Sequence, residues 1–272
     1  MLIATFAFSF MALLVKTLDR IPTIQVAFGR SLFSLMVCLF LIRRKRVHAF
    51  GKNHKLLITR GLLGTGGLVC YFYALQHIPL ASAITIQNLS PMITILFAGI
   101  FFGDTKATWT QWIFFICAFI GVFIVKGFDS RISPFDLSVS LFGVLCASFA
   151  YNSVRKLNKT DSPLIVVFYF SWISALVLAP ISAFQWVWPN LNEWLLLILL
   201  GIIVQFSQMN LTKAYQLEKP SRVSYLDHLS ILYGLVGGYF IFGEVIPTQA
   251  FLGIILIILS VIAATMIGKR PI

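Results

Sequence analysis

Long apolar stretches, separated by short polar turns, run through almost the entire chain. The longest stretch without Asp, Glu, Lys or Arg extends from Gly61 to Gly103, which is 43 residues. A single helix of that length would measure about 65 Å, roughly twice the apolar thickness of a bilayer. The stretch must therefore fold back, and Gln76-His77-Ile78-Pro79 is the polar, proline-containing place for the turn.

The same pattern predicts ten membrane-spanning helices, because each crossing needs about 20 mostly apolar residues. A second long stretch, Asn192 to Gly243, divides near Glu218-Lys219-Pro220. The predicted spans are roughly 2–18, 22–42, 57–76, 80–103, 107–126, 135–157, 162–184, 192–214, 220–243 and 246–268. The fold class that follows is an all-α membrane protein with ten transmembrane helices.

Composition excludes a water-soluble protein. The 272 residues are 59% hydrophobic and 11% charged, whereas a soluble domain is about 25% charged. The ten spans leave only short connections, of which 43–56 is the longest. No room remains for a soluble ATPase, receptor or catalytic domain. Because no G-x-x-x-x-G-K-[ST] phosphate loop occurs, ATP-driven transport would require a separate subunit.

The basic excess predicts an orientation. Lys and Arg number 21 against 9 Asp and Glu, a net charge of +12. With a cytoplasmic N-terminus, 16 basic residues, Arg60 among them, fall on the inner side and 4 on the outer side, while Arg30 lies inside a span. This asymmetry follows the positive-inside rule and predicts an inner-membrane protein with both termini cytoplasmic. Since topology accounts for the charge, no nucleic-acid partner is expected.

An internal repeat divides the chain in two. Sliding the sequence by 140 residues aligns Ala74–Lys126 with Ala214–Met266 without a gap. The most informative match is an F-G-acid-x3-T motif, found at Phe102–Thr108 and at Phe242–Thr248. We therefore predict two five-helix repeats, residues 1–131 and 132–272. An odd number of spans per repeat forces opposite orientations, and inverted repeats are typical of transporters whose substrate site lies between the halves.

Several motifs resemble those of one family. They are Arg60-Gly61-Leu62-Leu63, Tyr73-Ala74-Leu75, Pro79-Leu80-Ala81-Ser82-Ala83, Leu89-Ser90-Pro91 and Phe102-Gly103-Asp104 in the first half, with Lys213-Ala214-Tyr215 and Tyr239–Glu244 in the second. On these motifs the chain resembles the EamA group of the drug/metabolite transporter superfamily over essentially its whole length. The resemblance implies a 5+5 helix arrangement and transport of a metabolite. Family members export amino acids and related compounds, and some import S-adenosylmethionine.

The chain departs from the family pattern at two places. Ile231 stands at the second-half counterpart of Pro91. The first span has no carboxylate before Asp19, whereas the small multidrug pumps of the superfamily use a carboxylate in their first helix. Their proton-exchange mechanism is therefore not implied here.

Ionisable groups inside spans are costly and are examined first as functional residues. Arg30, Asp227 and His228 are such groups. Their depths along the helices allow Arg30 and Asp227 to pair, directly or through a substrate. The functional interpretation is that Arg30 binds a substrate carboxylate, and that Asp227 binds a substrate ammonium group or a coupling proton. The alternative is that Arg30 caps backbone carbonyls while Asp227 and His228 face an inner vestibule.

Polar side chains on other spans extend this candidate substrate site. Thr85 and Asn88 share a stripe at helical spacing, and Tyr225 and His228 are their repeat equivalents. The further candidates are Tyr151, Asn152, Gln205, Gln208 and, as a stacking residue near Tyr169, Trp172. Hydrogen bonding between helices, or packing for the aromatic residues, is the alternative for each.

The function predicted is secondary-active transport of a small organic metabolite, an amino acid or a derivative, by alternating access. Import of S-adenosylmethionine or a nucleotide-like metabolite is one alternative, and a membrane scaffold or membrane-embedded enzyme is another. Neither a catalytic centre, a metal site nor a cofactor is expected, because the four histidines form no catalytic constellation and the cysteines have no C-x-x-C spacing. Expected partners are the substrate, the lipid bilayer and a candidate coupling proton, for a monomer or weak homodimer.

Overall fold

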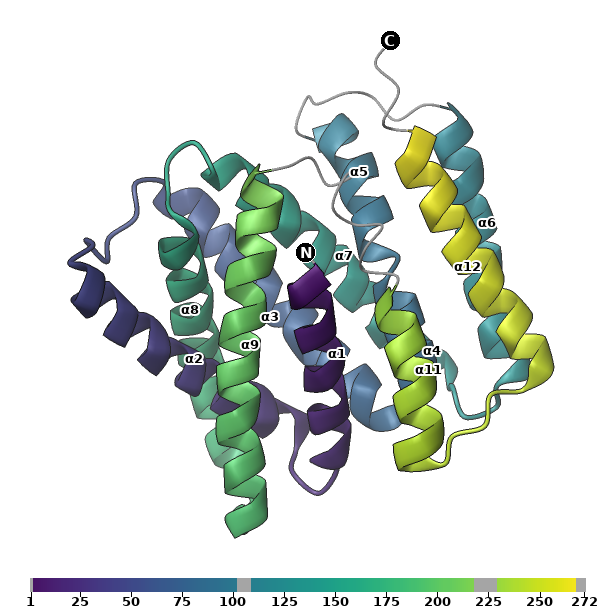
Figure 1. The fold of residues 1–272 in the computed structure, drawn as a ribbon, viewed down its shortest axis with the longest axis horizontal. Helices are drawn as coiled ribbons and strands as arrows, with labels where there is room; N and C mark the ends of the chain where they lie inside the picture. Colours follow the sequence, from purple (N-terminus) through teal and green to yellow (C-terminus); the bar gives the residue numbers. More distant parts are fainter. Residues whose placement is uncertain (1, 102–108, 218–228, 268–272) are drawn as a thin grey trace.

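The computed structural model describes residues 2–101, 109–217 and 229–267, and these ranges contain helices and no strand. The helices are α1 (Leu2–Thr17), α2 (Thr23–Lys45), α3 (His54–His77), α4 (Leu80–Gln87), α5 (Ser90–Phe101), α6 (Trp109–Phe128), α7 (Pro134–Leu157), α8 (Pro163–Phe184), α9 (Leu191–Leu217), α11 (Leu229–Phe242) and α12 (Thr248–Ile267) (Figure 1).

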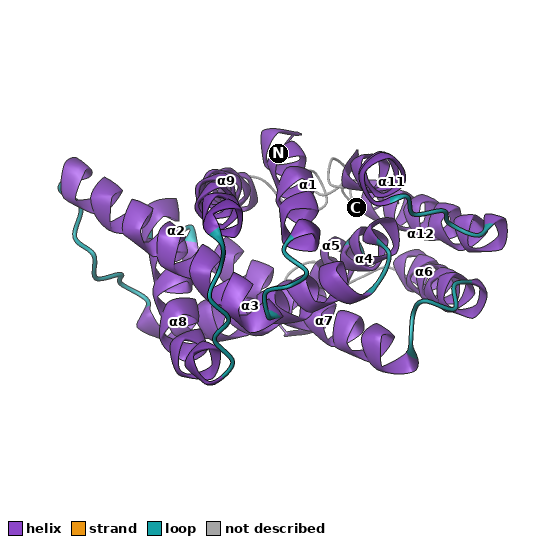
Figure 2. Ribbon diagram, turned by 90° about the horizontal axis from the view of Figure 1, so that it is seen from below, coloured by secondary structure: helices purple, strands orange, loops and turns teal. Residues whose placement is uncertain are grey.

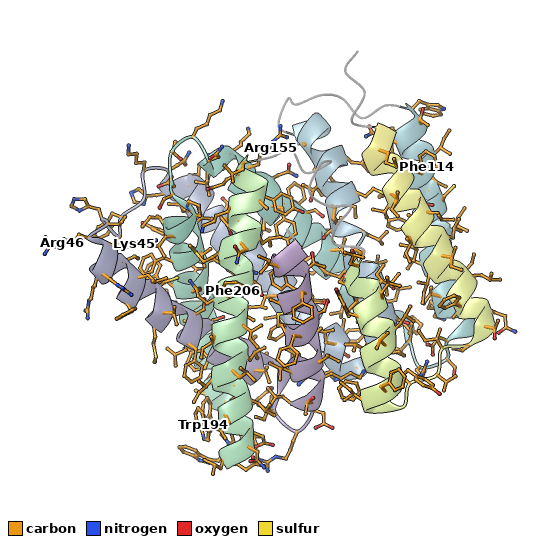
Figure 3. All side chains as sticks on the ribbon, in the orientation of Figure 1. Lys45, Arg46, Phe114, Arg155, Trp194 and Phe206 are labelled. Atoms are coloured by element: carbon orange, nitrogen blue, oxygen red, sulfur yellow. The ribbon has the colours of Figure 1, made fainter. Side chains whose placement is uncertain are left out.

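The all-α membrane fold predicted from the sequence is confirmed. Within the described ranges, seven helical segments are long and apolar enough to cross a membrane, with Leu80–Ala98 taken as one segment. Shorter apolar helices at Ile3–Thr17, Leu229–Phe242 and Thr248–Ala263 occupy the remaining three predicted spans. Large apolar side chains also cover the outer surface. Phe206 on α9, labelled in Figure 3, is 54% exposed, and Leu176 on α8 is 62% exposed, as expected for surfaces that contact lipid.

The predicted span 80–103 is not one continuous helix. It is interrupted by a turn at Asn88 and Leu89, which separates α4 from α5. Pro91 has no N–H to continue the helical ladder. The helix tightens before it, since the Leu89 N–H donates to the Ile86 carbonyl, three residues back, at 3.0 Å. Backbone freed in this way at membrane depth is tolerated where it is buried in protein or lines a cavity.

Helices of the two halves interlock around the centre of the molecule. Seen from below (Figure 2), α9, α1 and α11 lie along one side and α8, α3 and α7 along the other. Thus α1 contacts α9 and α11 of the second half, while α7 contacts α3, α4 and α5 of the first half. Helices α6 and α12 pack against each other at one end of the row. The centre is therefore built from both halves together.

The two edges of the bundle differ in charge. In Figure 3, Arg155 lies near the upper edge, Lys45 and Arg46 lie at the left end around mid-height, and Trp194 lies near the lower edge. Helix α1 starts near the middle of the view in Figure 1 and runs downward, whereas α7 ends near the upper edge and so runs upward. The first helices of the two halves are therefore oppositely directed.

Candidate functional site

A central cavity lies between the halves, with about 130 Å³ of space open to the centre of a water molecule. Side chains from α1, α2, α3, α4, α5, α7, α8, α9 and α11 line it. Of the described residues, none on α6 or α12 contributes to the lining. Small-molecule sites of this kind are mostly apolar pockets with a few placed polar groups, and the polar groups here are unusual.

Two arginines are buried in the cavity wall against the same aromatic ring. Arg30 on α2 is 1% exposed, and Arg60 on α3 is 3% exposed. Their guanidinium carbons lie 4.9 and 4.2 Å from the centroid of the Phe170 ring on α8. Cation–π attraction offsets part of the cost of burying them. The three residues are widely separated in sequence, and only the packing of α2, α3 and α8 brings them together.

Neither guanidinium is saturated with hydrogen bonds. The Nε and Nη1 atoms of Arg30 and the Nε atom of Arg60 are buried and have no hydrogen-bond partner. The ion pairs among the described residues are Lys16–Glu244, Arg20–Glu193 and Arg131–Asp129, so neither buried arginine has a carboxylate partner there. A buried charge of this kind requires compensation, which a bound anion would supply.

Buried acceptor atoms without partners also line the cavity. They are the Asn88 Oδ1 atom, at the break between α4 and α5, and the Gln208 Oε1 atom on α9. The Asn88 amide nitrogen is occupied, since it donates to the Ile84 carbonyl at 2.8 Å and to Ser230 Oγ on α11 at 3.0 Å. Residues of the cavity wall therefore carry buried, unpaired donors on the arginines and buried, unpaired acceptors on two amides, and these groups are complementary to a molecule with acidic and amino groups.

Four of the residues predicted from the sequence lie in this cavity: Arg30, Asn88, Tyr151 and Gln208. The Tyr151 ring stacks on Tyr215 at 5.0 Å between centroids. Three others, Tyr225, Asp227 and His228, lie outside the described residues, and their roles stay predictions.

The remaining predicted residues do not line the cavity. Thr85 donates to the Ala81 carbonyl at 2.6 Å within its own helix. Asn152 donates to the Thr94 and Ser148 carbonyls at 3.0 and 3.1 Å. Gln205 accepts from Ser34 Oγ and contacts the Cys38 sulfur at 3.1 Å. The Trp172 side chain is 45% exposed on the outer surface of α8. The polar side chains of Thr85, Asn152 and Gln205 thus form hydrogen bonds with backbone carbonyls or with side chains of neighbouring helices.

Arg60 is the main residue that sequence reasoning assigned to the wrong environment. The predicted span 57–76 has Arg60 at its inner end, among the cytoplasmic basic residues, whereas α3 begins at His54 and places Arg60 in its second turn, where it is buried. The helix begins there because the Asn53 side chain accepts from the Leu56 N–H at 3.2 Å. Asn is a preferred N-cap residue, so Asn53 was the signal that could have moved the start of the helix three residues earlier and Arg60 away from its end.

Gly64 makes the position of Arg60 possible. It lies one turn after Arg60 on α3, and a Cβ atom there would lie 2.0 Å from Arg60 Nη1 and 2.9 Å from the Phe170 ring. We expect Gly64→Ala to push the Arg60 guanidinium off Phe170 and to reduce transport at least tenfold while the protein still folds. The measurement is initial transport rate in proteoliposomes, normalised to folded protein by gel filtration.

The matched control for Gly64 is Gly66 on the same helix. A Cβ atom at Gly66 would meet the Cys146 sulfur at 3.5 Å, an ordinary van der Waals contact. Gly66→Ala should retain near-normal rates. Equal rates for the two variants would show that the position of Arg60 does not matter for transport.

Below the cavity, an ion pair joins three parts of the lower edge. The Lys16 Nζ atom at the end of α1 lies 2.7 Å from a Glu244 carboxylate oxygen beyond α11. Lys16 also donates to the Ile78 carbonyl after α3, at 2.9 Å. The Glu244 carboxylate accepts from the Leu80 N–H, the first of α4, at 2.8 Å. We call this set of contacts, Lys16–Glu244 with Ile78 and Leu80, the lower latch.

The F-G-acid motif explains the position of Glu244. Gly243 has φ of 62°, in the left-handed region that glycine adopts without strain. Its N–H donates to the Tyr239 carbonyl at 3.1 Å, and the Glu244 N–H donates to the Gly238 carbonyl at 2.9 Å. The chain thus turns sharply at the end of α11 and directs the Glu244 carboxylate toward Lys16.

Further polar contacts close the same edge. Gln76 at the end of α3 donates to the Leu18 and Ile21 carbonyls at 2.8 and 3.1 Å. Gln25 on α2 exchanges two hydrogen bonds with the Val187 backbone, at 2.6 and 2.9 Å. Helices of both halves are therefore joined at the lower edge.

A multi-pass helical bundle with a polar central cavity, built from two interlocked halves, is the architecture of a membrane transporter. The comparisons with known proteins agree. The chain matches the EamA-like transporter family over residues 1–127 and 136–266, and it belongs to this family.

Curated relatives of this chain are metabolite transporters. It is 30% identical to the pseudopaline exporter CntI of Pseudomonas aeruginosa strain PAO1, over 98% of this chain and 95% of that protein. It is 28% identical to an S-adenosylmethionine uptake transporter of Rickettsia bellii, over 88% of this chain and 82% of that protein. It is 29% identical to a riboflavin transporter of Vibrio cholerae, over 75% of this chain and 69% of that protein.

A solved crystal structure has the same fold. It is 19% identical in sequence and superposes with a TM-score of 0.69, over 99% of this chain and 96% of that chain. The family assignment and this likeness confirm a multi-pass membrane transporter fold.

Proposed function

We propose that the protein is a secondary-active transporter that carries an amino acid or an amino-acid derivative across the cytoplasmic membrane by alternating access. The observation that carries the proposal is the cavity, in which unpaired guanidinium donors and unpaired amide acceptors lie between the two halves. A carboxylate fits the donors, and an ammonium group fits the amide oxygens.

The contacts between helices support an inverted repeat of residues 1–131 and 132–272. If the two repeats are superposed, α1 corresponds to α7, α2 to α8 and α3 to α9. The contact of α1 with α9 then corresponds to that of α7 with α3, and α2 with α9 corresponds to α8 with α3. The pairs α2–α8 and α6–α12 map onto themselves. In transporters, such repeats exchange conformations around a fixed central site.

The basic upper edge supports an orientation with both termini in the cytoplasm. In this orientation the lower latch faces outward and closes the cavity on the outer side. The break between α4 and α5 adds a place where the lining helix can bend. Asp227, outside the described residues, is our candidate for binding the coupling proton.

The proposed function is tested with the purified protein in liposomes. A thermal-shift screen against amino acids, S-adenosylmethionine and nucleotides identifies ligands, because a ligand that binds the folded state raises its apparent stability. Uptake of the radiolabelled ligands is then measured with and without a proton gradient. Ligand-dependent uptake of an amino acid or derivative is expected. If no metabolite is carried, in either direction or under any gradient, the proposal is wrong.

A second candidate function is uptake of S-adenosylmethionine. It is favoured by the several Rickettsia relatives that are named as S-adenosylmethionine uptake transporters. The same liposome assay separates the two, because S-adenosylmethionine and simple amino acids are tested side by side.

The lower latch gives a prediction about alternating access. Replacing Glu244 by Gln removes the ion pair with Lys16, so the outward-open state should become more populated. We expect several-fold faster labelling of a Cys placed at Met11, a cavity position on α1, by a membrane-impermeant maleimide added from outside. The experiment uses a background in which the four native cysteines are replaced by Ser.

Two comparisons make this prediction specific. Lys126→Gln removes a basic charge in the last turn of α6, outside the latch, and should leave labelling unchanged. The double exchange Lys16→Glu with Glu244→Lys restores opposite charges and should slow labelling again. Identical labelling in wild type and Glu244→Gln would exclude the latch as an outer gate.

A further inference from the structure

We infer that Arg30 and Arg60 together form a two-arginine clamp that selects a substrate with two acidic groups, such as an amino dicarboxylic acid. The inference rests on the proposed transport function and names its substrate class. We call Arg30, Arg60 and the Phe170 ring between their helices the clamp. Sequence reasoning assigned a carboxylate to Arg30 alone, and the structure adds the second guanidinium.

The first step is a count of charges. The chain has nine Asp and Glu residues, and six of them lie in described ranges. These six are at the edges of the bundle or in its connections: Asp19, Asp129, Asp136, Asp161, Glu193 and Glu244. Asp129, Glu193 and Glu244 pair with other basic residues. Asp136 accepts from Tyr73 at 2.9 Å, and Asp161 accepts from the Lys52 N–H at 2.6 Å.

None of these carboxylates lines the cavity. Asp227 is the acidic residue that the sequence places at the depth of the clamp. A single carboxylate would balance only one of the two guanidinium charges. The two buried arginines carry two positive charges, and Asp227 can balance at most one of them. At least one buried positive charge is therefore left over, and burying it is unfavourable unless a ligand balances it.

The second step is geometry. Both guanidinium carbons lie near the centroid of one ring, at 4.9 and 4.2 Å, so they cannot be further apart than the sum of these distances, about 9 Å. A guanidinium binds a carboxylate through two parallel N–H donors. Two carboxylates separated by a short carbon chain fit within this upper limit. The unpaired Nε and Nη1 atoms of Arg30 and Nε atom of Arg60 are donors that such a ligand would occupy.

The third step is what surrounds the clamp. Position 64 is a glycine, and its missing side chain leaves room for the Arg60 guanidinium. A Cβ atom at this position would collide with the Arg60 Nη1 atom where it now lies. Across the cavity, the unpaired Asn88 and Gln208 oxygens can accept from an ammonium group. The clamp and the two amide oxygens together are complementary to a ligand with two acidic groups and one amino group.

The test uses the full-length purified protein and four probes: glutamate and glutarate carry two carboxylates, whereas glutamine and alanine carry one. Binding is measured by calorimetry or thermal shift in wild type and in Arg60→Gln. We expect wild type to bind the two-carboxylate probes at least tenfold more tightly than the one-carboxylate probes. In Arg60→Gln this ratio should fall to near one.

One further variant and one further measurement keep the test decisive. Arg20→Gln removes an exposed arginine paired with Glu193 at the lower edge and should keep the ratio. Arg60→Gln without ligand should unfold at the same or a higher temperature than wild type, because one uncompensated buried charge is gone. A lower unfolding temperature, together with equal weakening for all four probes, would assign Arg60 a structural role and overturn the clamp.

The outcomes also separate the clamp from the proposed function. If wild type carries neutral or cationic metabolites in liposomes but shows no preference for two-carboxylate probes, the clamp is wrong and the transporter assignment stands. If wild type carries no metabolite at all, the proposed function fails and the clamp fails with it.

Discussion

Replacement of Arg30 by Ala is expected to reduce the transport efficiency, kcat/KM, for a carboxylate-bearing substrate by between about 30-fold and several thousand-fold. Removing one partner of a buried, hydrogen-bonded charge pair costs about 2–5 kcal/mol, and each 1.36 kcal/mol is a factor of ten. The Arg30 guanidinium is fully buried and two of its nitrogens have no partner within the protein. A substrate carboxylate would therefore depend strongly on it.

The control for Arg30 compares two substrates in one variant. An amino acid and its amide differ in the carboxylate alone, so Arg30→Ala should affect the amino acid much more than the amide. Arg30→Lys keeps a charge but lacks the planar, two-pronged donor set, and should show an intermediate rate. Equal losses for the amino acid and the amide would mean that Arg30 supports the structure and does not bind the carboxylate.

The second large effect is on stability, at the contact between α6 and α12. Gly121 and Gly253 allow these helices to approach backbone to backbone. A Cβ atom at Gly253 would lie 2.7 Å from the Gly121 carbonyl oxygen and 2.9 Å from the Val125 nitrogen. Backbone atoms in the middle of a helix cannot move aside, so the two helices would have to separate. Small residues at such crossings are typical of membrane helix pairs.

We expect Gly253→Ala to lower the free energy of unfolding by about 1–3 kcal/mol, the usual cost of overpacking. Gly253→Leu should prevent recovery of folded protein. Monodisperse yield in detergent and the thermal unfolding midpoint measure both effects. Gly127→Ala on α6 is the control, because a Cβ atom there meets no atom within 4 Å. An unchanged midpoint in Gly253→Ala would show that the helix pair does not depend on this close approach.

These two predictions concern different parts of the molecule. No described residue of α6 or α12 lines the cavity, so Gly253→Ala should change stability without changing substrate preference. Arg30 lies in the cavity wall, so its replacement should change substrate preference. Measuring both properties in both variants distinguishes loss of the fold from loss of the site.

The order of helices was predictable because each crossing of a bilayer needs a long apolar segment, which is a local property of the chain. The boundaries were less predictable. The interruption at Asn88 and Leu89 follows from Pro91, which the hydrophobic pattern alone treats as part of one span. The start of α3 at His54 depends on the Asn53 cap, and this shift of three residues moves Arg60 from the first turn of the predicted span 57–76 to the second turn of the helix.

For the candidate site, the type of a residue could be used to select it, but the residues that it contacts could not be predicted. An arginine inside an apolar span draws attention because its burial is costly, so Arg30 could be selected from the sequence. Helical periodicity alone could not separate Gln208, which lines the cavity, from Gln205, which joins α9 to α2 through Ser34. Both glutamines lie on the same span, and only the packed neighbours distinguish them.

By itself, the sequence determined the all-helical membrane class, the ten spans, the family and the presence of a buried arginine, since these depend on composition and local order. The tertiary structure alone decided that Arg30, Arg60 and Phe170 meet at one point and that Lys16 pairs with Glu244. These contacts join residues far apart in the chain. Their distances depend on how the helices pack, and helix packing is set by the summed fit of many side chains rather than by any local pattern.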